Sequence, residues 1–189
     1  MNKSLSILPV EVEDFPALVV LINQAYRGDG ITTGWTTESH LLKGSSRTDL
    51  NALTELNNIP GTCLLKCSMS DGTIIGFVCL QKEQFTIHLG MLSVSIHHQG
   101  VGIGKLLIDA SKNYARMQGC DTITIEVISV RDELIAWYER HGFIRTGETL
   151  PFPTDNRFGT PIQPLEFAVL VKNISQETEI RGTKTGPVA

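Results

Sequence analysis

The feature that most constrains the fold of this chain is a glycine-rich segment, residues 99–105, between several short apolar runs and a long amphipathic stretch. The runs at 63–67, 74–80 and 85–94 have the composition of strands, and only short turns separate them. Strands in such close succession form an antiparallel meander rather than repeated strand-helix-strand units. After the segment, apolar spacing predicts a helix over 102–117 with a buried side of Leu106, Leu107, Ala110, Tyr114 and Met117.

The same patterns extend the prediction along the chain. A strand at 5–10 precedes a helix that ends at 27–28. The apolar face of this helix carries Phe15, Leu18, Val19, Ile22 and Tyr26. Further predicted elements are short helices at 36–42 and 49–56, a strand at 123–128, a helix at 133–140, a strand that ends near 148, and a final strand at 165–171. Because the last residues are polar and aperiodic, we expect one domain over 1–174 and a flexible tail over 175–189.

Composition argues against several classes of partner. The 189 residues include 16 basic and 20 acidic side chains, for a formal net charge of -4, so a basic surface for nucleic acid is not expected. The four cysteines form no CxxC pair and have no histidine-rich ligand spacing, so no metal is expected. No apolar stretch approaches the roughly 20 residues of a membrane span, and the first residues do not resemble a signal peptide. We therefore expect a soluble cytoplasmic protein with no membrane partner.

A loop with alternating glycines that opens a helix points backbone N–H groups and the positive helix end at one place, where an anionic group would bind. A Walker loop would need Gly at 99 and Ser or Thr at 106, but the chain has Gln99 and Leu106. The dinucleotide fingerprint has a different glycine spacing. The glycines would also permit tight packing of helix on strand, and the pattern alone leaves both interpretations open.

Two segments decide between these interpretations by resemblance. Met91–Val94 followed by Gln99, Gly102 and Gly104 resembles the acyl-CoA motif Q/R-x-x-G-x-G/A of the GNAT acetyltransferases, and residues 136–143 resemble that family's LYEKxGF segment. The resemblance covers about residues 61–143. It implies an α/β (α+β) fold with a mixed, mostly antiparallel sheet of six to seven strands, helices on both faces, and a splay between the fourth and fifth strands. It also implies acetyl-CoA as cosubstrate.

The resemblance also assigns roles to individual residues. Tyr138 matches the family tyrosine that protonates the departing thiolate. Arg131 departs from the asparagine that many members have there; it would reach a phosphate or a substrate carboxylate, or lie in solvent. The residues implied in cofactor binding are Leu92, Ser93, Val94, Gln99, Gly100, Val101, Gly102, Ile103, Gly104, Lys105, Arg131 and Tyr138.

The general base is less defined, because many members have a glutamate on the fourth strand where this chain has Gly90. His88 lies two residues away on the same strand face, and a histidine side chain can accept a proton near neutral pH. Glu126 and Glu83 are alternative candidates, and a structural role for His88 also stays open.

The acceptor in this fold usually enters over the first helices and their loop, which makes residues 26–38 a candidate acceptor segment. Trp35 would form an apolar wall, Glu38 would attract an ammonium group, and Arg27 or Arg47 would hold a carboxylate. Capping of a helix by this threonine-rich segment, with Glu38 near its positive end, is the alternative.

The leading hypothesis is therefore an N-acetyltransferase that moves the acetyl group of acetyl-CoA directly to a primary amine of a small molecule, amino acid or peptide. The alternative is a GNAT-like regulatory module that binds acyl-CoA without turnover. A homodimer is compatible with both.

Overall fold

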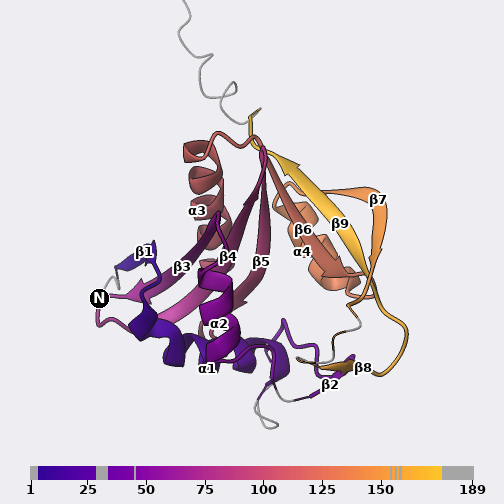
Figure 1. The fold of residues 1–189 in the computed structure, drawn as a ribbon, viewed down its shortest axis with the longest axis horizontal. Helices are drawn as coiled ribbons and strands as arrows, with labels where there is room; N and C mark the ends of the chain where they lie inside the picture. Colours follow the sequence, from indigo (N-terminus) through magenta and orange to yellow (C-terminus); the bar gives the residue numbers. More distant parts are fainter. Residues whose placement is uncertain are drawn as a thin grey trace, which may run out of the picture.

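The computed structural model describes residues 4–28, 34–44, 46–153, 155, 157 and 159–175. A seven-stranded sheet in the order β1-β3-β4-β5-β6-β9-β7 runs through this part of the chain (Figure 1). Every neighbouring pair is antiparallel except β5 with β6, so the predicted mixed, mostly antiparallel sheet is confirmed. The strands are β1 (Leu5–Pro9), β3 (Thr62–Met69), β4 (Ile74–Glu83), β5 (Thr86–Val94), β6 (Thr122–Ile128), β7 (Ile144–Pro151) and β9 (Glu166–Asn173).

Helices cover both faces of this sheet, as the resemblance implies. On one face lie α1 (Phe15–Arg27), which follows the short η1 (Val12–Asp14), and α2 (Leu50–Asn57). On the other lie α3 (Ile103–Met117) and α4 (Asp132–Arg140) (Figure 1). The short η2 (Ile96–His98) connects β5 to the loop before α3.

The core is divided by the sheet because side chains of a strand alternate between its two faces. On β4, Phe77 and Cys79 pack with α1 and α2, whereas Val78 and Leu80 pack with α3 and α4. A central strand buried on both faces reads as a continuous apolar run, which is why 74–80 is easily recognised in the sequence.

β5 has a bulge against β4, at residues beyond its pairing with β6. Phe77 pairs with Ser93 and Cys79 pairs with Gly90, so Met91 and Leu92 lie opposite one residue of β4, and Met91 takes a positive φ of 49°. The parallel pairing of β5 with β6 covers only residues 86–88 against 122–124. Beyond that point the two strands diverge (Figure 1), which confirms the splay between the fourth and fifth strands of the large sheet.

Two predictions about local structure are wrong. The helix predicted at 36–42 is absent: Thr37 and Ser39 bond to each other, and β2 (Leu42–Lys43) pairs with the distant β8 (Thr160–Pro161). Side-chain bonds of Thr and Ser compete with helical backbone bonds. On α3, Leu106 and Met117 are exposed, and the buried residues are Ile103, Leu107, Ile108, Ser111 and Ala115.

The described residues contain no helix long and apolar enough to cross a bilayer. The predicted tail lies outside them, apart from Ser175. The boundary of the predicted domain therefore stays a prediction.

Candidate functional site

Two cavities of about 290 Å³ each open at the splay. The loop cavity is bordered by the glycine-rich loop, the start of α3 and one side of α4. The sheet cavity lies between the diverging ends of β5 and β6 and the chain segments that cover them. Four residues line both cavities and mark the junction between them: Tyr26, Leu92, Leu134 and Tyr138.

The loop cavity contains the positive end of α3. Gly102 is the N-cap with a φ of 92°, and its carbonyl accepts the first helical bond from the Leu106 N–H at 3.0 Å. The N–H groups of Ile103, Gly104 and Lys105 precede that bond in the first turn, where helices leave donors without helical acceptors. Those donors and the helix dipole favour an anionic group such as a pyrophosphate.

The glycine at position 104 makes room for an aromatic wall. A Cβ there would lie 3.1–3.2 Å from the indole of Trp137, closer than ordinary contact. Trp137 meets Trp35 edge-on with centroids 6.0 Å apart, and its ring centroid lies 4.2 Å from that of His141. Because all three rings line the loop cavity, this cavity combines the positive end of α3 with an aromatic wall. Trp35 therefore lies on the loop cavity and does not line the sheet cavity.

Gln99 and Arg131 hold the segment that carries Trp35. The Gln99 amide donates to the Val94 carbonyl at 3.2 Å and accepts from the Trp35 N–H at 2.8 Å. The buried Arg131 guanidinium donates to the carbonyls of residues 35–37 and pairs with Glu133. Its donors are thus directed at protein carbonyls and a carboxylate. This is neither the solvated arginine nor the phosphate contact considered from sequence.

The other residues of the predicted cofactor segment differ in position. Gly100 takes a φ of 78° and lines the loop cavity, as does Val94. The Ser93 hydroxyl is buried and donates to the Met91 carbonyl at 2.9 Å. Val101 is exposed and does not line the loop cavity.

Lys105 lines the loop cavity through a largely exposed side chain, which pairs with Asp109 at 2.7 Å. Salt bridges of such exposed side chains are worth little. The loop cavity therefore depends more on fixed backbone donors than on this charge.

Two buried tyrosines meet at the junction of the cavities. Burial raises the pKa of Tyr138 above its ordinary range, an effect that the neighbouring Tyr26 increases, so its hydroxyl is neutral near pH 7. Burial likewise raises the pKa of Tyr26 to about 12, and this hydroxyl donates to the Leu92 carbonyl at 3.3 Å. From the sequence, Tyr26 was expected on the apolar face of its helix and as the first residue of the candidate acceptor segment, without a role of its own. Its position in the last turn of the helix, at the start of that segment, was the signal available.

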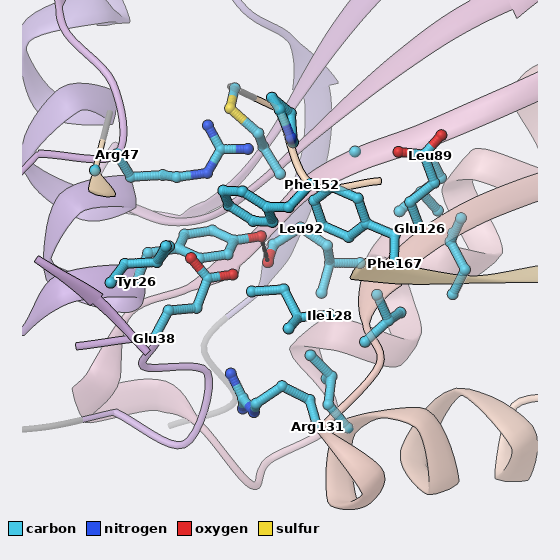
Figure 2. A pocket seen from close by; sticks show the side chains of 18 of the residues that line it. Tyr26, Glu38, Arg47, Leu89, Leu92, Glu126, Ile128, Arg131, Phe152 and Phe167 are labelled. Carbon is cyan, nitrogen blue, oxygen red and sulfur yellow. Dashed lines mark hydrogen bonds between the residues drawn. The ribbon is translucent and has the colours of Figure 1, made fainter. Parts of the chain in front are cut away.

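The sheet cavity has polar ends and an apolar wall, as Figure 2 shows. His88 and Glu126 lie on neighbouring strands at one end; Glu83, the other candidate base, does not line this cavity. Arginine and glutamate side chains lie at the opposite end. The apolar wall consists of Leu42, Ile128, Phe152 and Phe167.

Arg27 and Glu38 are brought together in the sheet cavity. The Arg27 Nη1 lies 2.6 Å from Glu38 Oε2, and the side chains are only 2% and 14% exposed. The predicted ligands for a carboxylate and an ammonium group therefore bind each other. The described residues contain no cluster of three or more His, Cys, Asp or Glu placed to hold a metal ion.

We expect Glu38→Gln to lower the free energy of unfolding by about 1.5–3 kcal/mol, because the buried Arg27 guanidinium loses its charged acceptor. Acetyl-CoA affinity should not change, since Glu38 does not line the loop cavity. Chemical denaturation measures the first effect and calorimetry the second. The matched control is Glu139→Gln, which removes the exposed pair with Arg145 and should cost less than about 1 kcal/mol. Unchanged stability together with weaker use of cationic acceptors would instead support the ammonium site.

With this geometry established, comparison with known proteins identifies the class of protein. Residues 34–143 match the Acetyltransferase (GNAT) family, which is more than half of the chain. The chain therefore belongs to the GNAT acetyltransferase family.

Part of this chain is similar in sequence to curated proteins. Mouse N-acetyltransferase family 8 member 7 is 28% identical over 123 residues, which cover 61% of this chain and 53% of the relative. N-acetylaspartate synthetase of Danio rerio is 26% identical over 111 residues, covering 58% and 39%. The chain thus spans about half the length, or less, of these curated relatives.

Solved structures share the fold over nearly the whole chain. The Escherichia coli ribosomal-protein-S18-alanine N-acetyltransferase has a TM-score of 0.66 at 17% identity, covering 91% of this chain and 95% of that one. The structure of yncA from Salmonella typhimurium with its cofactor acetyl-CoA has a TM-score of 0.65 at 17% identity, covering 98% and 99%. At such identities the likeness establishes the fold alone.

Proposed function

We propose that this protein transfers the acetyl group of acetyl-CoA to a primary amine of a small molecule, amino acid or peptide. The observation that carries the proposal is the meeting of two cavities at Tyr138 and Leu92. A thioester bound from the loop cavity and an amine bound from the sheet cavity would then reach each other without a covalent enzyme intermediate.

The loop cavity fits the cofactor in two respects. The first-turn N–H groups of α3 offer fixed donors for the pyrophosphate, and the glycines at 100 and 102 let it approach the backbone. The part of the cavity at the junction is lined by Leu92 and Tyr138 and would receive the pantetheine arm and thioester. Backbone N–H groups of the 92–94 segment are the proposed donors to the thioester carbonyl.

The chemistry requires an ammonium acceptor to lose two protons and the sulfur to gain one. The nitrogen lone pair attacks the carbonyl carbon, the C–S bond breaks, and the thiolate takes a proton from the Tyr138 hydroxyl. His88, with Glu126 beside it on the next strand, is the proposed acceptor of the ammonium proton, directly or through water. As the intermediate collapses, the second proton of the nitrogen returns to the Tyr138 oxygen, directly or through water, and His88 releases its proton to solvent.

The test is release of free thiol from acetyl-CoA in the presence of amines, amino acids, polyamines and peptides. We expect acceptor-dependent release well above the uncatalysed rate, with mass spectrometry showing one acetyl group added to nitrogen. Tight acetyl-CoA binding with no release for any acceptor would favour the regulatory module.

A further inference from the structure

From the charges of the sheet cavity we propose that the acceptor is an α-amino acid with an apolar side chain, whose carboxylate pairs with Arg47. This inference rests on the proposed function and narrows its substrate class. Arg47 lines the sheet cavity at the end opposite His88 and Glu126, and its guanidinium points into the space shown in Figure 2.

The arginines around Tyr26 differ in what they bind. Arg27 pairs with Glu38, and Arg131 pairs with Glu133 and backbone carbonyls. Within the described parts of the chain, no carboxylate forms a salt bridge with Arg47, whose guanidinium carbon lies 5.4 Å from the centroid of the Tyr26 ring. Two of the three guanidinium groups are thus paired with carboxylates and Arg47 is not, while Glu126 and Asp155 also line the sheet cavity.

Arg47 is held in place by the main chain. The Asn23 side chain accepts from the backbone N–H groups of Arg47 and Thr48 at 2.5 and 3.0 Å, and donates to the Thr48 carbonyl at 3.0 Å. This network fixes the segment against α1. A half-buried guanidinium with a fixed base and a stacked ring loses little freedom when it binds an anion, and its fork matches a carboxylate.

The short separation between the amine and the carboxylate of an α-amino acid suits this end of the sheet cavity. Tyr26 connects Arg47, over its ring, to the junction, where its hydroxyl bonds to the Leu92 carbonyl. In an α-amino acid the nitrogen lies about 2.5 Å from the carboxylate carbon, as backbone bond lengths require. A carboxylate at Arg47 therefore keeps the amine at the Arg47 and Tyr26 end of the cavity, from which its proton would reach His88 through water.

The third substituent of the acceptor would face the apolar wall. Phe152 and Phe167 stack with centroids 5.1 Å apart and are half-buried, and Ile128 and Leu42 complete the surface (Figure 2). All four side chains of this wall are apolar, and Asp155 also lines the cavity. An apolar side chain would gain from burial there.

The experiment compares L-phenylalanine with L-phenylalaninamide, which have the same amine and side chain and differ in the carboxylate. We expect kcat/KM to be about 10–100-fold higher for the acid, the range of a charge-assisted hydrogen bond. Arg47→Gln should remove this preference by lowering the value for the acid alone, and Arg47→Lys should retain part of it. The control Arg145→Gln removes an exposed charge on β7 and should change neither. Glycine should be about 10–100-fold poorer than phenylalanine.

A second measurement does not depend on turnover. In calorimetry, N-acetyl-L-phenylalanine should bind at least about 10-fold more tightly than its amide, and Arg47→Gln should abolish the difference. Equal use of acid and amide by the unchanged protein, or an equal loss for both in Arg47→Gln, would overturn the carboxylate site while leaving acetyl transfer intact. If no amine causes thiol release but N-acetyl-L-phenylalanine still binds more tightly than its amide, the proposed acetyl transfer would be overturned and the carboxylate site at Arg47 would stand.

Discussion

Gly102→Glu should weaken acetyl-CoA binding by about 100-fold or more. Gly102 caps α3 with a φ of 92°, and a carboxylate at that position would occupy the space and oppose the charge of the pyrophosphate. Binding is measured by isothermal calorimetry on the folded variant. The loss should exceed that caused by any change on the sheet cavity, because the proposed anion site lies in the loop cavity and depends mainly on its backbone donors.

Gly72→Glu is a matched control for this effect. Gly72 lies in the turn between β3 and β4 and has a φ of 85°; like Gly102, it has no heavy atom within 4 Å of the position that a Cβ would take. Both variants therefore place a glutamate in a left-handed conformation, at a similar cost of about 1–2 kcal/mol in stability. Only Gly102→Glu should lose affinity. Similar acetyl-CoA affinities for the two variants would contradict an anion site at the start of α3.

Tyr138→Phe should lower kcat by roughly 10- to 1000-fold with little change in acetyl-CoA affinity, because the ring still fills the junction while the proton donor is lost. Since burial raises the pKa of Tyr138 above its ordinary range, the hydroxyl stays protonated through mildly alkaline pH. The loss should therefore be of similar size at pH 7 and pH 9. Steady-state thiol release over that pH range measures it.

Tyr114→Phe is the control for Tyr138→Phe. Tyr114 is a half-buried tyrosine of α3 that lines neither cavity, and its hydroxyl interacts with Cys63. Its turnover should stay near that of the unchanged protein. Full activity in Tyr138→Phe at every pH would make Tyr138 a packing residue, and another donor, such as Tyr26, would then have to protonate the thiolate.

Much of the fold follows from local pattern. The meander, the four predicted helices other than the absent one at 36–42, and the final strand were predictable because each buries a continuous or periodic apolar set. The bulge at Met91 and Leu92 was not, since it arises from the register between β4 and β5. The pairing of β2 with β8 joins residues far apart in sequence and leaves no local signal.

One part of the candidate site could likewise be predicted from the sequence, and the other could not. Gly100, Gly102 and the start of α3 form an anion site from one continuous segment, because glycine conformations and the helix dipole are properties of the local chain. The sequence alone therefore predicted the proposed phosphate site and, through the resemblance, the tyrosine that we propose lies near the thioester.

Tertiary structure alone decided which charges remain available to an acceptor. The sequence predicted Arg27 or Arg47 for a carboxylate, Glu38 for an ammonium group, and Arg131 for a phosphate, a carboxylate or solvent. The fold pairs Arg27 with Glu38 and directs Arg131 to the carbonyls of 35–37. It leaves Arg47 over Tyr26 without a carboxylate partner among the described residues. Charge pairing depends on distances of a few ångströms between segments remote in sequence, and only the packed structure sets those distances.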